Sequence, residues 1–365
     1  MNHHDWPLVT GRWPLKKDLP SSPRMAILIV NAAVWTGVST MEARDARYNE
    51  YSAYLKKKYG EKIYKLPVNL PGTCPNRDGT VGEGGCIFCD EQGAGFECLP
   101  NSMDVTNQIK ENKAFFQKRF KGKKYFAYFQ AFTNTYRDLE SFKEGIAAAV
   151  RDEDIIGLSI STRPDCINDT YLDFLAGLQA EKELVINIEL GLQTVNYHTL
   201  KKINRGHTLG EYIDAVLRIK QRRFEIVTHL ILNLPWDDET DVIECAKVCS
   251  ALGVDFVKLH SLYVVKDTVL GEMFARGEFD IISLEEYIDR VVVFLEYLDP
   301  AVVIQRLVGK GPQGNLHFCN WSTSWWKIKQ RIEEVLAERD TWQGRRFNYT
   351  NGPAVKKWVQ KSDEW

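Results

Sequence analysis

Six apolar runs alternate with longer helical patterns between about Tyr59 and Tyr263. The runs are rich in Val, Ile, Phe and Tyr and are mostly continuous, which is typical of strands covered on both faces of a sheet. We predict strands at Val68–Leu70, Tyr125–Phe132, Ile155–Ile160, Val185–Leu192, Ile226–Leu234 and Phe256–Tyr263. The helical patterns between them lie at residues 105–119, 138–150, 169–179, 209–221 and 239–252. This alternation predicts an α/β fold in which six βα units form a partial barrel.

Polar side chains follow the predicted strands. In a parallel barrel, the loops after the strands converge on one crevice at the carboxyl ends of the strands. A polar residue that closes a single strand is usually only a cap or a turn. Here such residues recur from strand to strand, and we expect them to share one site: Thr133, Asn134, Ser161, Arg163, Glu189, Gln193 and His260.

The loop after the first predicted strand carries three cysteines in the segment CPNRDGTVGEGGCIFCD. Cys74, Cys86 and Cys89 have the spacing C-x11-C-x2-C, and the glycines between them give the loop the backbone freedom to fold around a cluster. Three thiolates can bind an iron-sulfur cluster and leave one iron open, whereas a closed metal site normally has four ligands. Cys98 is the nearest further cysteine. A structural zinc site made by these four cysteines is therefore the competing interpretation.

Taken together, these motifs resemble the radical S-adenosylmethionine (SAM) superfamily, and more narrowly a bacterial family related to the Elongator catalytic subunit. The resemblance covers about residues 47–342 and runs through YSAYLKKKYG, the cysteine segment, YFQAFTNTY, STRPDC, ELGLQT and RGH. The commonest spacing in the superfamily is C-x3-C-x2-C, and the longer first gap of this chain matches the expanded loop of the Elongator branch. The resemblance implies a partial (β/α)6 TIM-like radical SAM barrel with a C-terminal α-rich extension.

The resemblance also implies two cofactors, a 4Fe-4S cluster and SAM. Cys74, Cys86 and Cys89 are the implied ligands of three irons, and SAM would chelate the fourth iron. Reductive cleavage of SAM would then give a 5′-deoxyadenosyl radical that abstracts hydrogen from a substrate. By position in the family, the implied SAM contacts are Phe88, Gln130, Thr133, Asn134, Ser161, Arg163, Glu189, Gln193 and Arg205. The catalytic residues are not identified by the motifs, and the candidates are His207 and Cys319.

We expect three segments along the chain: a poorly ordered leader (1–40), the barrel (41–270, with the cluster loop at 74–89) and a basic, Trp-rich C-terminal extension (271–365). From Ala301 to Trp365 there are eleven Lys or Arg and six Asp or Glu, a net charge of +5, whereas the whole chain carries −2. This mixture suits phosphate contact and base stacking. The alternative is a capping helix whose tryptophans pack on the barrel. The residues concerned are Trp321, Trp325, Trp326, Trp342, Trp358, Lys327, Lys329, Arg331, Arg345, Arg346, Lys356 and Lys357, and Lys118–Lys124 is a second basic stretch.

The leading hypothesis is therefore a radical SAM enzyme that modifies RNA, specifically a tRNA uridine base, with an external electron donor such as flavodoxin or ferredoxin. One alternative keeps the radical chemistry and gives it a small molecule or a protein side chain as substrate. Another is a non-catalytic zinc protein that binds nucleic acid. The eight cysteines do not form a secreted disulfide framework, so we expect a reducing, cytoplasmic setting. No apolar run is long enough to span a bilayer, and nothing in the sequence indicates the oligomeric state.

Overall fold

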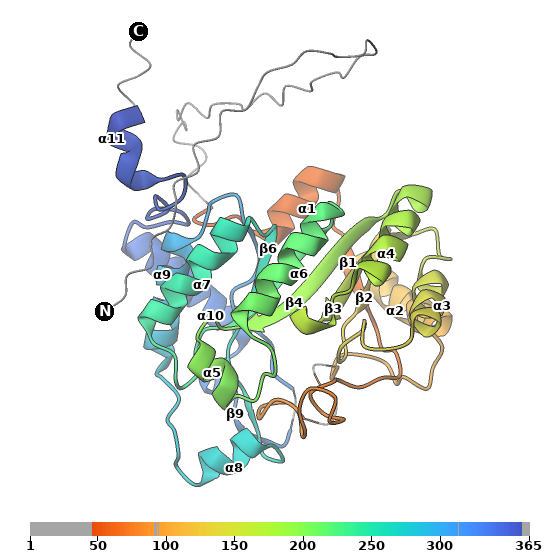
Figure 1. Ribbon diagram of the computed structural model, residues 1–365, viewed down its shortest axis with the longest axis horizontal. Coiled ribbons are helices and arrows are strands. Elements are labelled where there is room, and N and C mark those ends of the chain that lie inside the picture. Colours follow the sequence, from red (N-terminus) through yellow and green to blue (C-terminus); the bar gives the residue numbers. More distant parts are fainter. Residues whose placement is uncertain (1–45, 91–92, 94, 313, 360–365) are drawn as a thin grey trace, which may run out of the picture. The chain divides into compact units, whose positions relative to one another are not determined.

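The central sheet has seven parallel strands, and their order in the sheet follows the chain. The computed structural model describes residues 46–359 except 91, 92, 94 and 313, so the predicted leader lies outside the described residues. The sheet curls into a partial barrel (Figure 1). Its strands are β1 (Tyr64–Val68), β2 (Tyr125–Phe129), β3 (Ile155–Thr162), β4 (Val185–Gln193), β5 (Glu225–Ile231), β6 (Phe256–His260) and β8 (Val303–Arg306).

The structure confirms the partial barrel and differs from the sequence prediction at both edges of the sheet. β1 ends at Val68, earlier than expected, because the backbone N–H and C=O of Asn69 bond the side chain of Gln108 and not a neighbouring strand. At the other edge, the short apolar run Val302–Ile304 joins the sheet as the seventh strand, β8, which pairs with β6. The predicted C-terminal extension thus contributes the last strand of the sheet.

The connecting helices begin where polar caps place them. Asp104, Asp138 and Asp238 each accept a hydrogen bond from a backbone N–H of the first turn, which satisfies a donor that the helix itself cannot. The main hydrophobic core includes Phe142 from a helix and Ile188 from β4, both fully buried. The helices are α2 (Val105–Phe120), α3 (Leu139–Ala149), α4 (Asp169–Lys182), α6 (Leu209–Gln221) and α7 (Glu239–Leu252), and they flank the strands in Figure 1.

The remaining elements surround the ends of the barrel. The loop that carries the cysteines (orange) lies at the same end as α5 (Tyr197–Lys202) and α8 (Val269–Ala275) in Figure 1. Backbone bonds join these three segments: Ile87 N–H donates to Ile203 at 3.1 Å, and Leu270 N–H donates to Ile87 at 2.8 Å. The other elements are α1 (Tyr51–Tyr59), β7 (Val264–Val265) paired with β9 (Leu316–Phe318), α9 (Leu284–Tyr297), α10 (Trp325–Glu338), α11 (Lys356–Val359) and three short 3₁₀ turns.

Across the described part of the chain, no helix combines the length and the apolar character that crossing a membrane requires.

The register between β3 and β4 can be tested with a pair of glycines. A Cβ at Gly157 would lie 2.4 Å from a ring atom of Phe126 and 2.5 Å from the carbonyl oxygen of Val185. Gly157→Ala should therefore lower the free energy of unfolding by about 1 to 3 kcal/mol. Gly177, in α4, has no heavy atom within 4 Å of the same position. Gly177→Ala should raise the free energy of unfolding by about 0.5 to 1 kcal/mol. Urea unfolding measures both, and equal effects would contradict this register.

Candidate active site

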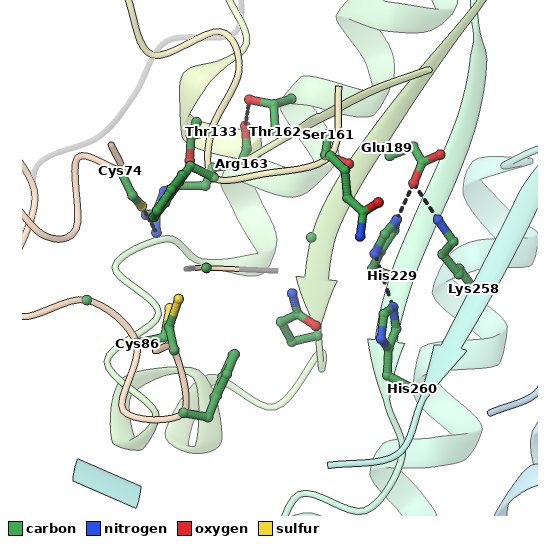
Figure 2. A pocket seen from close by; sticks show the side chains of 18 of the residues that line it. Cys74, Cys86, Thr133, Ser161, Thr162, Arg163, Glu189, His229, Lys258 and His260 are labelled. Atoms are coloured by element: carbon green, nitrogen blue, oxygen red, sulfur yellow. Dashed lines mark hydrogen bonds and ion pairs between the residues drawn. The ribbon is translucent and has the colours of Figure 1, made fainter. Parts of the chain in front are cut away.

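One cavity at the carboxyl ends of the strands gathers most of the predicted site residues. Cys74, Cys86 and Cys89 line it from the loop after β1. Figure 2 shows Cys74 and Cys86 on one side of the cavity and the group of Glu189, His229 and Lys258 on the other. The further predicted residues that line the cavity are Phe88, Gln130, Thr133, Ser161, Arg163, Glu189, Gln193, Arg205 and His260.

Asn134 is not among the residues that line the cavity. Its Nδ2 donates to three carbonyl oxygens, those of Phe129, Ala131 and Ser161, at 2.9, 3.2 and 2.9 Å. The side chain thus ties the end of β2 to β3. In this geometry Asn134 shapes the wall on which Thr133 sits, and the SAM contact that the resemblance implies for it stays a prediction.

The two candidate catalytic residues also lie outside the cavity lining. His207 is buried, with Nε2 3.0 Å from the carbonyl oxygen of Gly191. Burial, with Arg205 and Arg163 nearby, lowers the pKa of His207 to about 2, so the ring is neutral. Cys319 packs so closely on Gly311 that a Cβ on that glycine would lie 2.3 Å from Sγ. Neither side chain lines the cavity, and a catalytic role for either stays a prediction.

Each of the three cysteine sulfurs has an arginine beside it. A neighbouring positive charge favours the thiolate, which is the form that binds metal. The pairs are Arg163–Cys74 (3.9 Å), Arg205–Cys86 (3.4 Å) and Arg77–Cys89 (3.6 Å). Burial nevertheless raises the pKa of Cys89 to about 11. Metal binding at this position therefore has to displace a proton.

The positions of the cysteines fit a cluster better than a single metal ion. Among the described residues, no three Cys, His, Asp or Glu side chains lie close enough to hold one ion. A 4Fe-4S cluster does not need such a group, because each cysteine binds a different iron. Cys98 is not part of the cavity lining, and burial raises its pKa to about 12. The donor set fits a 4Fe-4S cluster with one open iron, and the competing four-cysteine zinc site is not assembled in the described part of the chain.

Residues 203–207, which include RGH, hold the cysteine loop against β4. The Nδ2 of Asn204 donates to the carbonyl oxygens of Glu83 and Gly85 at 3.1 and 2.8 Å. On the other side, Arg205 Nη2 donates to the carbonyl oxygen of Gly191 at 2.7 Å. A side chain at Gly191 would block this contact, since its Cβ would lie 2.6 Å from Arg205 Nη2. The motifs ELGLQT and RGH therefore act as one structural unit.

The guanidinium of Arg163 is bound by protein groups, and the SAM contact that the resemblance implies for it stays a prediction. Its Nε and Nη2 donate to the two carboxylate oxygens of Asp165 at 2.9 and 2.7 Å. Its Nη1 donates to the carbonyl oxygen of Arg205 at 2.8 Å. The planar fork that would suit the SAM carboxylate is thus already occupied by Asp165. Arg163 braces residues 203–207 from the cavity wall.

Glu189 is likewise fully engaged. Its Oε1 accepts from Lys65 and Ser159, and its Oε2 lies 2.8 Å from both Lys258 Nζ and His229 Nε2. Burial by itself would raise the pKa of Glu189, but Lys258 and Lys65 outweigh it and hold the pKa well below its usual range. The carboxylate is therefore ionised, with both oxygens bound by protein groups, and its predicted contact with the ribose hydroxyls stays a prediction.

Sequence reasoning missed the cations on this side of the barrel. Lys65, Lys258 and Arg306 each stand in a strand that is otherwise mostly apolar, in YKLPV, FVKLH and VIQR. A charged residue in such a strand is rarely buried unless it is paired or functional. That signal was present in the sequence, but it does not say which residue lies opposite.

Comparison with known proteins now identifies the family. The model of the radical SAM superfamily matches residues 69–249, and that of the radical SAM C-terminal domain matches residues 254–338. The uncharacterized protein YtqA of Bacillus subtilis is 34% identical over 303 residues, which are 83% of this chain and 94% of YtqA. The chain therefore belongs to the radical SAM superfamily, a family that implies a 4Fe-4S cluster and SAM.

The predicted relationship to Elongator proteins is also confirmed. The archaeal Methanocaldococcus infernus Elp3 structure matches with a TM-score of 0.60 at 17% identity, over 77% of this chain and 64% of Elp3. In sequence, the tRNA uridine(34) acetyltransferase of Methanocaldococcus jannaschii is 30% identical over 137 residues, which are 37% of this chain and 24% of that enzyme.

The ligand assignment can be tested by anaerobic reconstitution with iron and sulfide. Wild type and Cys98→Ala should each hold about four irons per chain, whereas Cys86→Ala should lose the cluster. Iron analysis and the visible absorption spectrum report the result. A loss of metal from Cys98→Ala as complete as that from Cys86→Ala would instead support a four-cysteine site.

The buried ion pairs of Glu189 can be tested by a double-mutant cycle. Glu189→Gln should lower the free energy of unfolding by about 3 to 5 kcal/mol, because it leaves Lys65 and Lys258 buried without a carboxylate. Adding Lys258→Met should recover part of this loss, since it removes one of the two uncompensated charges. Urea unfolding measures all the variants. Additive losses in the double variant would show that the two side chains do not interact.

Proposed function

We propose that this protein is a radical SAM enzyme that modifies a uridine base of tRNA. The observation that carries the proposal is the single cavity that joins three cysteines to the polar ends of the barrel strands. The relationship to the tRNA uridine(34) acetyltransferase supports a tRNA substrate. Since that match covers only 24% of the acetyltransferase, no acetyl transfer is proposed for this chain.

Different residues of this site would bind the cluster and SAM. Cys74, Cys86 and Cys89 would hold the cluster, and Thr133 and Ser161 present hydroxyls in the same cavity, where SAM would bind. When bound, the two cofactors supply the electron and the radical that abstracts hydrogen. The protein positions them and shields the cavity from water. An external flavodoxin or ferredoxin is the proposed source of electrons.

Exposed tryptophans near the cavity support contact with RNA. Trp325 and Trp326 begin α10 and are 46% and 52% exposed, and Lys327 Nζ lies 5.5 Å from the ring of Trp326. The helix starts shortly after Asn320, whose side chain bonds Ser261, next to the carboxyl end of β6, and Gly309, just after β8. This end of α10 therefore lies on the side of the barrel where the cavity opens. Exposed indole rings next to a cation suit base stacking and phosphate contact.

Other tryptophans and cations of the predicted basic patch pack on the protein, pair with glutamates or lie away from the cavity. Trp321 packs against Tyr287, and its Nε1 donates to the carbonyl oxygen of Ile282. Lys329, Arg331 and Arg346 form ion pairs with Glu333, Glu338 and Glu296. Trp342 and Arg345 follow the far end of α10, about 20 Å along the helix. Lys118–Lys124 spans the last turn of α2 and the connection to β2, so it lies at the amino end of the strands, away from the cavity.

We expect tRNA binding to depend on the near end of α10. Trp325→Ala combined with Trp326→Ala should weaken tRNA binding at least about tenfold, because stacking contributes roughly 1 to 3 kcal/mol per base. Trp342→Ala is the matched control at the far end and should bind like wild type. Fluorescence anisotropy at two salt concentrations measures both, and the wild-type affinity should fall with salt.

The accompanying activity assay uses reconstituted protein, dithionite and SAM, with chromatography for 5′-deoxyadenosine. tRNA should raise the yield. Formation of 5′-deoxyadenosine without any tRNA binding at moderate salt would favour a small molecule or a protein side chain as substrate. Absence of the product from protein that carries a full reduced cluster would overturn the proposed function.

A further inference from the structure

Arg306 is an enclosed cation that forms no ion pair with an acidic residue in the described part of the chain. It lies at the end of β8 and lines the cavity. Its Nη2 is 2.6 Å from His260 Nδ1, while its Nε is buried and has no hydrogen-bond partner among the described residues. In the described part of the chain, no carboxylate forms an ion pair with it, although Glu189 and Glu97 pair with lysines nearby.

The surroundings of Arg306 are cationic. Lys65 and Lys258 share one carboxylate, Glu189, and Lys310 pairs with Glu97 at 3.3 Å. Together with Arg306, four cations therefore face two carboxylates. The two histidines do not change this count, because burial lowers the pKa of His229 to about 4 and that of His260 well below its usual value. Both rings are neutral near pH 7.

The excess of positive charge contributes to the lowered pKa of Lys258. Burial lowers the pKa of Lys258 to about 7, in spite of Glu189, and the neighbouring Lys65 and Arg306 add to the fall. An enclosed cation is unfavourable unless an anion or several hydrogen bonds compensate it. The unfavourable free energy of an enclosed cation is commonly tolerated where a bound ligand supplies the missing negative charge.

We propose that Arg306, with Lys258, binds an anionic group of the substrate, a carboxylate or a phosphate, inside the barrel. The proposal rests on the proposed function in one respect, namely that substrate enters this cavity. Figure 2 shows Lys258 and His260 on the side of the cavity away from Cys74 and Cys86, so the anion would lie beyond the cofactors. The unpaired Nε and the adjacent Nη2 of a guanidinium offer two parallel donors, the geometry that an oxyanion accepts.

Thermal unfolding in the presence of simple oxyanions tests this site. The probes are sodium phosphate and sodium acetate at constant ionic strength, added to the full chain as isolated and after reconstitution. A ligand that binds the native state raises Tm. Wild type should be stabilised by at least one anion. Arg306→Gln should raise Tm without anion, since it removes an uncompensated charge, and should weaken anion binding at least tenfold.

Two matched variants complete the design. Arg306→Lys keeps the charge and should retain part of the response to the anion. Arg276→Gln changes an exposed arginine that pairs with Glu278 and should respond like wild type. A larger shift with acetate would indicate a substrate carboxylate, and a larger shift with phosphate would indicate a substrate phosphate. Either result supports the proposal.

Three results would overturn it. One is a wild type that responds to neither anion, and another is an Arg306→Gln variant that responds like wild type. The third is an Arg306→Gln variant whose affinity for SAM falls as far as its affinity for the oxyanion, which would assign the arginine to the cofactor. The titration needs neither a reduced cluster nor tRNA. Its failure is therefore distinguishable from a failure to form 5′-deoxyadenosine.

Discussion

The attachment of the cysteine loop to residues 203–207 is the constraint on which the rest of the site depends. The loop has little regular secondary structure, so its polar backbone groups need partners from elsewhere. Asn204 supplies two of them, and Ile203 accepts from Ile87 between the last two cysteines. Arg205 then joins this segment to both Cys86 and β4. The three cysteines of this loop are thereby held at the carboxyl edge of the sheet.

The opposite side of the cavity is organised by charge. Glu189 is buried in the middle of the sheet, and it is tolerated there because Lys65 from β1 and Lys258 from β6 reach it across the barrel. These ion pairs cross-link strands that are not neighbours in the sheet, so they stabilise the curl as well as the interior. The cavity therefore has one side that carries the cysteine sulfurs and another that carries Glu189, His229 and Lys258.

Short sequence patterns predicted most strands and helices, whereas the hydrogen-bond and ion-pair partners of the site residues depend on contacts between distant parts of the chain. The βα alternation, the caps of the helices and the spacing of the cysteines are all visible within short windows, so the barrel and the cavity lining were largely predictable. β8 was missed as a strand because an apolar run of three residues carries little periodic signal. Asn134 and Arg163 follow β2 and β3, and Glu189 lies within β4, but the partners of these side chains come from other loops and strands. No pattern along the chain shows that Asp165 occupies the fork of Arg163.

Because Asp165 binds the guanidinium of Arg163, we consider which other arginines of the cavity could bind an anion. With its fork bound to Asp165, the conspicuous arginine of the STRPDC motif has a bracing role. Among the described residues, the two arginines whose Nε atoms are buried without a partner are Arg205, beside Cys86, and Arg306, at the end of β8. An unpaired guanidinium Nε is costly, and two of them at one cavity indicate two separate needs for an anion. In our proposal, the anionic group of the substrate would satisfy the need at β8, and the need beside the cluster is left for the cofactor that the family implies.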